Sequence, residues 1–136
     1  MILDANIVLK WFIAEDDSDA ALRLRLEGDL LAPDIMPIEY RNALLNKVRR
    51  RAISIEEAER AEREIDGAGV IIISSAPLLS SAFRLALDLG EPIYDCIYFA
   101  AAIATNHVLV TADEKFATKA QASKVGGNRI KLLSRL

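Results

Sequence analysis

Val108-Leu109-Val110-Thr111-Ala112-Asp113 is the stretch that decides the fold. Its first four residues are apolar or β-branched, which predicts a short buried strand, and an aspartate follows two residues beyond it. Ile2-Leu3-Asp4 at the N-terminus has a similar arrangement, with an apolar pair followed at once by an aspartate. We expect further strands over residues 30–32 and 70–73, the second of them buried, and a last edge strand over 129–133.

Helical patterns separate these strands. We expect helices over residues 6–12, 19–26, 54–67, 77–90 and 93–106, and a long helix that begins at 37. Asp19 is a predicted N-cap, and Ser54 with Glu57 has the pattern of a capping box. The long helix has an expected apolar stripe of Ile38, Leu44, Leu45 and Val48. Apolar strands that alternate with helices predict an α/β fold, with a mainly parallel central sheet covered by helices on both faces.

Composition sets limits on the class of protein. A length of 136 residues fits one domain over 1–136, and 52% hydrophobic with 27% charged residues is typical of a globular chain. The single cysteine, Cys96, excludes an internal disulfide and fits a reducing compartment. No apolar run reaches the roughly 18 residues that cross a membrane, and the N-terminus does not have the pattern of a signal peptide. We therefore expect a cytoplasmic protein without membrane attachment.

Four acidic residues stand where an α/β sheet places its functional sites. Asp4 and Asp113 follow two strands, and sites in such sheets form beyond the carboxyl ends of the strands. Asp95 lies at the start of one expected helix, and Glu39 lies in the first turn of another, with Asn42 on the same face. The four carboxylates can therefore converge at one edge of the sheet.

Carboxylates held close together repel one another, and a divalent cation is the usual remedy. Oxygen ligands without histidine or thiolate favour Mg²⁺ or Mn²⁺ over Zn²⁺. Such an ion can activate a water molecule and stabilise the developing charge on a phosphate. The chemistry that we expect is hydrolysis of a phosphodiester.

Four segments carry a resemblance to a known family: residues 2–6 (ILDAN), 38–42 (IEYRN), 94–98 (YDCIY) and 109–116 (LVTADEKF). In order and placement they resemble the four motifs of the PIN-domain nucleases. The compact size is similar to that of the VapC-type toxins of toxin–antitoxin pairs. The match extends over nearly the whole chain.

The resemblance implies a PIN-like three-layer sandwich and a Mg²⁺- or Mn²⁺-dependent endoribonuclease. It assigns Asp4 and Asp95 to direct metal ligation and places Glu39 and Asp113 in the same acidic shell, as ligands directly or through water. It gives supporting roles, which orient carboxylates or water, to Asn6 and Thr111. It also implies a homodimer, an RNA substrate and an antitoxin protein that covers the acidic groove, often with an arginine among the carboxylates.

Structural roles compete with each of these assignments. Asp4 and Asp95 could be simple N-caps, and Glu39 a favourable acid in a first helical turn. Thr111-Ala-Asp-Glu114 has the pattern of a capping box, and Asn42 could be an ordinary polar residue of its helix. Tyr94, Tyr98 and Cys96 are expected in the core. The coincidence of all four acids in the family's order favours the functional interpretation.

The charge balance bears on RNA binding. A net charge of −3 is unusual for a protein that binds phosphates, which commonly has a basic surface. A local cluster of basic residues could suffice to bind RNA. The candidates are Lys115 and four residues at the end of the long helix: Lys47, Arg49, Arg50 and Arg51. The alternative is a solvated helix C-terminus whose cations complement the helix dipole.

Two other functions remain open. A phosphoaspartate-type phosphatase or phosphotransferase could use Asp4 as nucleophile, but it would need a second early acid and a well-placed lysine, and Lys131 is poorly placed. A catalytically silent binding module could also have this fold, although intact acids at four positions argue against it.

Overall fold

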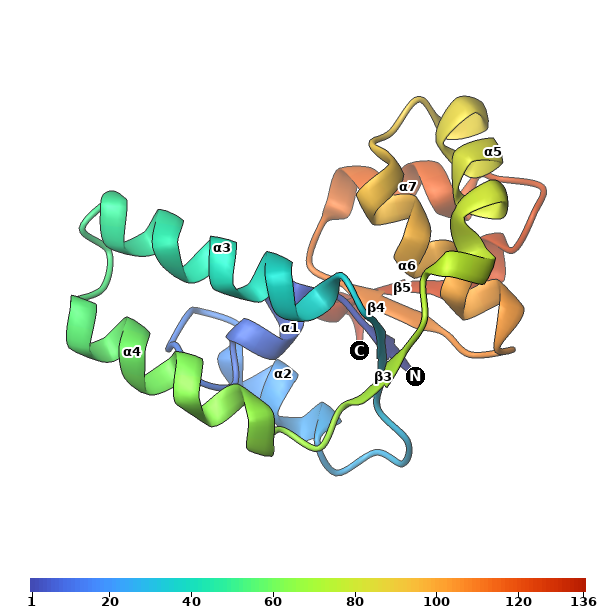
Figure 1. Cartoon of the computed structure of the whole chain (residues 1–136). Coiled ribbons are helices and arrows are strands. Elements are labelled where there is room, and N and C mark those ends of the chain that lie inside the picture. The colour runs from blue at the N-terminus through green and yellow to red at the C-terminus, as the bar shows by residue number, and fades with distance from the viewer.

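The computed structural model describes residues 1–136 and contains one five-stranded sheet between two groups of helices (Figure 1). The strands lie in the order β3-β2-β1-β4-β5, and all four pairings are parallel. The expected α/β fold with a parallel sheet is confirmed. The strands are β1 (Ile2–Leu3), β2 (Leu31–Pro33), β3 (Ile71–Ile73), β4 (Leu109–Thr111) and β5 (Ile130–Leu132).

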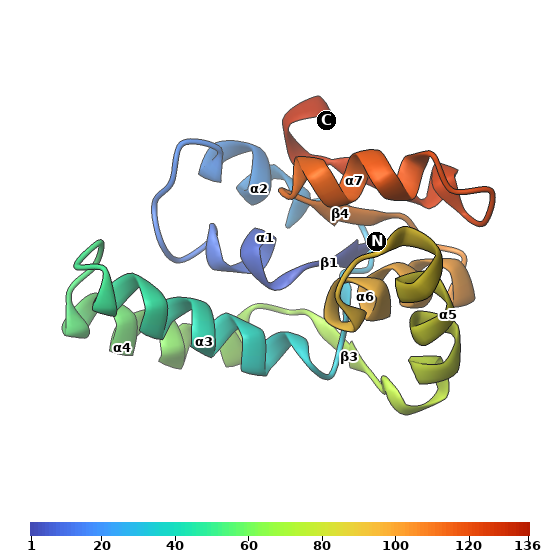
Figure 2. The same ribbon diagram turned by 90° about the horizontal axis from the view of Figure 1, so that it is seen from above.

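Helices cover the sheet on both sides, and contacts divide them into two groups. One group packs α1 against α3 and α3 against α4, and the other packs α5 against α6. Figures 1 and 2 show the two groups on either side of the strands. The helices are α1 (Ala5–Leu9), α2 (Ser18–Leu24), α3 (Met36–Arg49), α4 (Ile55–Glu64), α5 (Leu79–Leu89), α6 (Ile93–Ala104) and α7 (Glu114–Gln121).

The core lies around the central strands and α6. Ile2, Leu3 and Leu109 are fully or almost fully buried, and α6 crosses β1, β2 and β4. Phe99 of α6 meets Phe116 of α7 edge to face at 6.3 Å between ring centroids, so the two helices share one layer. The expected buried helix over 93–106 is therefore confirmed. None of the helices has the length and apolar character that crossing a membrane requires.

Several local predictions need correction. The strand expected over 70–73 is not buried, because β3 stands at the edge of the sheet and leaves Ile71 and Ile72 about half exposed. In α3 the buried side chains are Met36, Tyr40 and Leu44, and much of the expected stripe faces solvent. Helix α2 begins one residue before Asp19, so that this residue lies in the first turn and is not the N-cap.

Candidate functional site

The four predicted acids line one small hollow of about 240 Å³ at the carboxyl edge of the sheet. Register pairs Leu3 of β1 with Val110 of β4, so the segments that carry Asp4 and Asp113 leave the sheet side by side. The first turn of α3 brings Glu39, and the first turn of α6 brings Asp95. The sequence-based expectation that these side chains share one edge agrees with this arrangement.

Asp4 has a structural task as well as a place in the hollow. It is the N-cap of α1, and its Oδ1 accepts a hydrogen bond of 2.9 Å from the backbone N–H of Ile7. Burial raises the pKa of Asp4, while the Thr111 hydroxyl and three backbone N–H groups donate to the carboxylate and oppose the rise. These donors fix the orientation of the carboxylate.

Asp113 is the N-cap of α7, and its Oδ1 accepts a hydrogen bond of 2.9 Å from the N–H of Phe116. The capping box expected between Thr111 and Glu114 is therefore wrong. The Thr111 hydroxyl instead accepts a hydrogen bond of 3.0 Å from the N–H of Asp113. Because Thr111 also bonds Asp4, it connects the two aspartates that follow the central strands.

Glu39 is held by an aromatic side chain of the opposite helical group. The hydroxyl of Tyr98 donates a 2.5 Å hydrogen bond to Oε2 of Glu39. Tyr98 is 2% exposed, and burial together with the charge of Glu39 raises its pKa, so that the hydroxyl keeps its proton. Tyr98 is thus the expected core aromatic with a bonded hydroxyl, and it also lines the acidic hollow. The same expectation for Tyr94 is wrong, because its side chain is exposed.

Asp95 differs from the other three acids because its carboxylate accepts no hydrogen bond, whereas Asp4 and Asp113 cap helices and Glu39 is bonded to Tyr98. The N-cap of α6 is Pro92, without a side-chain hydrogen bond. Burial is the largest of the effects that raise the pKa of Asp95 to about 6, followed by the negative charges of neighbouring acids: Glu39, Asp113, Asp4 and Glu91. Both effects disfavour the charged form of Asp95 as long as no cation is present.

The donors of this hollow fit a hard divalent cation. Its acidic groups are all carboxylates, with no histidine or thiolate among the lining side chains. No group of three or more acidic, histidine or cysteine side chains is already drawn together closely enough to hold an ion. Mutual repulsion and the capping bonds of Asp4 and Asp113 account for this separation, because each capping bond fixes one oxygen of its carboxylate.

Three asparagines complete the polar lining. Asn6 and Asn42, both predicted from sequence, lie in the hollow together with Asn46, which was not predicted. Asn46 is four residues after Asn42 and seven after Glu39 in α3. This spacing places the three residues on one helical face, so helical periodicity could have found Asn46.

A second hollow of about 450 Å³ adjoins the acidic one and shares Asn6, Ala43, Asn46 and Asp113 with it. Its other polar lining comes from Lys10 and Glu15 and from two of the predicted basic residues, Lys47 and Arg50. Lys10, Glu15 and Asn46 had no functional assignment from sequence.

The other predicted basic residues lie elsewhere. Arg49 and Arg51 are exposed at the end of α3 and line neither hollow. Lys115 lies in α7, 3.9 Å from Glu91, which also pairs with Lys119. Glu91 is another residue that sequence reasoning missed, and its charge contributes to the raised pKa of Asp95.

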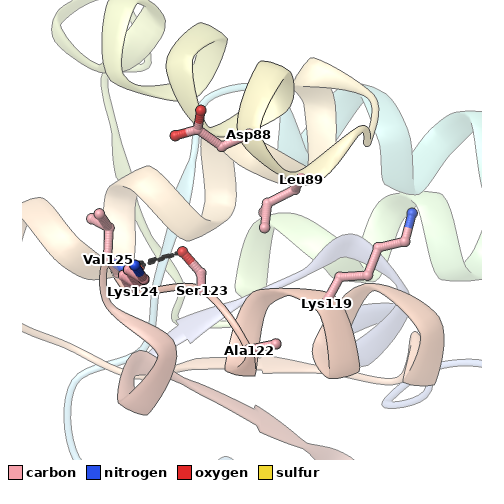
Figure 3. Close-up of a pocket in the computed structure, with 7 residues that line it drawn as sticks. All are labelled: Asp88, Leu89, Lys119, Ala122, Ser123, Lys124 and Val125. Carbon is pink, nitrogen blue, oxygen red and sulfur yellow. Dashed lines mark hydrogen bonds between the residues drawn. The ribbon is translucent and has the colours of Figure 1, made fainter.

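A further hollow lies between the end of α5 and α7 (Figure 3). Asp88 is its single carboxylate, and Lys119 and Lys124 are its cations. The Ser123 hydroxyl accepts a hydrogen bond of 3.2 Å from the N–H of Val125, drawn as a dashed line in Figure 3. With one acid, this hollow does not have the paired carboxylates found at the sheet edge.

Comparison with known proteins gives a family over most of the chain. Residues 1–122 match the family described as PIN domain. A curated relative, Ribonuclease VapC3 of Pyrobaculum aerophilum, is 29% identical over 122 residues, which are 88% of this chain and 93% of that protein.

Solved structures share the fold. A crystal structure of a P. aerophilum protein superposes with a TM-score of 0.71 at 22% identity, covering 98% of this chain and 83% of that one. A toxin–antitoxin complex from Klebsiella pneumoniae gives 0.65 at 16% identity, covering 97% of this chain and 96% of that one. VapBC2 from Rickettsia felis, bound to a DNA fragment from its promoter, gives 0.63 at 17% identity, covering 96% of each.

Proposed function

This chain belongs to the PIN-domain family, and from that membership we propose that it is a metal-dependent endoribonuclease that hydrolyses RNA phosphodiester bonds. The observation that carries the proposal is the single hollow lined by Asp4, Glu39, Asp95 and Asp113. The relative named as a ribonuclease, which matches over 93% of its own length, supports RNA as the substrate.

We propose Mg²⁺ or Mn²⁺ as the cofactor, held by these four carboxylates. When bound, such an ion lowers the pKa of a water molecule and stabilises the charge that develops on a phosphate. Asp95 would be an immediate ligand because its carboxylate is buried among negative charges and has no capping bond. Asp4 would offer the oxygen that does not cap α1.

The surrounding side chains prepare the carboxylates for this task. Tyr98 fixes Glu39 by donating a hydrogen bond from its hydroxyl, and Thr111 bonds both Asp4 and the backbone of Asp113. Groups that orient ligands in this way raise the effectiveness of a metal site because the ligands lose little freedom on binding. Asn6 and Asn42 line the hollow and are placed to orient water or phosphate oxygens.

We further propose that the chain is the toxin of a toxin–antitoxin pair. Two structural relatives, a toxin–antitoxin complex and a VapBC assembly, support this proposal. An antitoxin segment with an arginine would complement the acidic hollow, because a guanidinium can bind a carboxylate in a bidentate manner. Induced expression should arrest a bacterial host, and co-expression of the cognate antitoxin should relieve the arrest. A homodimer, also expected, is testable by light scattering.

The decisive experiment measures cleavage of total RNA, with mapped ends, in Mg²⁺, in Mn²⁺ and in EDTA. We expect cleavage with either metal and none in EDTA. Asp95→Asn should abolish cleavage while leaving the far-UV circular dichroism unchanged. Asp19→Asn is the matched control, because Asp19 is an exposed acid in the first turn of α2. Full activity of the Asp95→Asn protein would remove this residue from the mechanism.

A phosphatase with Asp4 as nucleophile is less well supported. No lysine lines the acidic hollow, and Lys131 lies exposed on β5, two strands away from β1. A phosphoryl-aspartate intermediate needs such a cation to neutralise the phosphate charge. Trapping with beryllofluoride tests this alternative, and a protein that binds RNA without cutting it in any metal would point to a silent binding module.

A further inference from the structure

The second hollow combines positive charge with direct access to the acidic site. It is walled by α1 and α3, and Lys10, Lys47 and Arg50 face it. Four of its lining residues also line the acidic hollow, so the two form one continuous depression. Its volume of about 450 Å³ is within the range of roughly 300–1,000 Å³ found for ligand sites.

An internal anion holds two of these cations in place. Glu15 pairs with Lys10 at 2.5 Å and also with Lys47, and Lys10 reaches Asp17 at 2.7 Å. Burial acts to raise the pKa of Glu15, but the hydrogen bonds and charges of the two lysines outweigh it and lower the pKa. Glu15 is therefore ionised at neutral pH and fixes both ammonium groups.

One cation of this hollow has no acidic partner. Lys10 and Lys47 pair with Glu15, and Lys10 also pairs with Asp17, whereas Asp113 at the border with the acidic hollow pairs with none of them. Arg50 is exposed and belongs to none of the ion pairs of the structure. The unpaired guanidinium of Arg50 therefore suits a single anionic group.

An RNA strand bound for cleavage needs such a group beside the acids. The carboxylates repel the phosphates on either side of the one being cut, and only the metal offsets that repulsion locally. A cation in the adjoining hollow would stabilise the next phosphate along the strand and so set the register of the RNA. This step rests on the proposed ribonuclease function.

We propose that the second hollow binds one RNA phosphate adjacent to the scissile one, through Lys47 and Arg50, and that Glu15 limits the affinity by sharing Lys47. Lys10 serves as a positioning residue, because it anchors Glu15 from the buried side. Arg49 and Arg51, which line neither hollow, are not part of this subsite.

The test is binding of a fluorescein-labelled single-stranded RNA to the Asp95→Asn protein, measured by fluorescence anisotropy over a range of salt concentrations. Loss of one phosphate contact reduces the slope of log K against log salt by about 0.7 and weakens binding about fivefold at 0.1 M salt. We expect this full result for the Lys47→Ala/Arg50→Ala double variant, and a part of it for Lys47→Ala and for Arg50→Ala alone. Lys131→Ala and Arg60→Ala, exposed residues outside both hollows, should leave binding unchanged.

Glu15→Gln should tighten RNA binding, a result that damage to the fold would not produce. Loss of the negative charge raises the local positive potential, so RNA binding should become about two- to fivefold tighter. An oligonucleotide with one phosphate replaced by an uncharged methylphosphonate locates the contact. The replacement next to the cleavage position should weaken binding to the Asp95→Asn protein but not to the form that also carries Lys47→Ala and Arg50→Ala, because that form has already lost both contacts to the phosphate.

The possible results separate this subsite from the ribonuclease proposal. If wild type cleaves RNA while Lys47→Ala and Arg50→Ala bind it with unchanged affinity and salt slope, the subsite is overturned and the function stands. The basic hollow would then be open to another partner, such as an acidic protein segment. If wild type cleaves no RNA in any metal, the ribonuclease proposal fails.

Discussion

Asp95→Asn should stabilise the protein in the absence of metal, although the same change should abolish cleavage. Folding brings Asp95 close to the negative charges of Glu39, Asp113 and Asp4. Asparagine has nearly the same shape as aspartate and no charge, so the substitution removes the repulsion without opening a cavity. Functional sites commonly carry such a cost in stability.

The magnitude follows from the pKa of Asp95, which rises from its usual 3.8 to about 6. At 1.36 kcal/mol per pKa unit this rise corresponds to roughly 3 kcal/mol of unfolding free energy. Partial exposure to solvent screens the charges and halves that figure to about 1.5 kcal/mol. Loss of the favourable acid in the first turn of α6 reduces this gain in unfolding free energy by about 0.5 kcal/mol. We expect a net gain of about 1 kcal/mol, or about 3–5 °C in Tm.

The gain should depend on pH in a defined direction. A raised carboxyl pKa means that the folded protein holds the proton more tightly than the unfolded chain. The contribution of Asp95 to the unfolding free energy of the metal-free wild type should therefore fall as the pH rises through the window from 3.8 to about 6. Asp95→Asn lacks this fall, so the two proteins should differ little at the lower end of the window and most above its upper end.

Urea and thermal unfolding in EDTA, at about pH 5 and about pH 7.5, measure the difference. Asp19→Asn, the same substitution at an exposed first-turn position, controls for the change of residue type. Added Mg²⁺ should then stabilise wild type more than Asp95→Asn, because a bound ion stabilises only the state that holds it. The reasoning is refuted if Asp95→Asn is no more stable than wild type in EDTA at the higher pH.

Three further changes test other parts of the structure. Tyr98→Phe removes the hydrogen-bond donor to Glu39. Cleavage should fall about tenfold, half-saturation should need a higher metal concentration, and Tm should change by only a few degrees. An unchanged metal titration would contradict the positioning role. Gly127→Ala would place a Cβ 2.5 Å from a backbone oxygen, whereas Gly67→Ala meets nothing within 4 Å, so urea unfolding should show a loss of about 2 kcal/mol for the first and almost none for the second. Tyr40→Phe deletes a buried 2.8 Å hydrogen bond to a carbonyl of α4 and should cost about 1–2 kcal/mol in the same assay, while equal stability would show that the bond contributes nothing.

Local patterns were enough to predict the sheet and its acidic edge. Short apolar runs next to Asp4 and Asp113 could be read as strands because a buried parallel strand must be apolar on both faces. Caps fixed the limits of some helices, as at Ser54, where the expected capping box is present, and at Gly90, which ends α5. The caps expected at Asp19 and Thr111 were wrong. Motif order and spacing then identified all four acids of the hollow.

Features that depend on distant partners could not be predicted in this way. Ile71 and Ile72 have the sequence of a buried strand and are exposed, because sequence does not say which strand lies at the edge. Lys47 reads as an ordinary lysine at the end of a helix, yet it pairs with Glu15, 32 residues away.

The sequence by itself determined the alternation of strands and helices and the chemical type of the site, because spacing along the chain and residue type are local properties. Only the tertiary structure decided that Tyr98 holds Glu39, that Asp95 is the one carboxylate of the four that accepts no hydrogen bond, and that a basic hollow opens beside the acids. These three features depend on which helices pack against each other at the edge of the sheet. That packing is determined by the whole chain and not by any one segment.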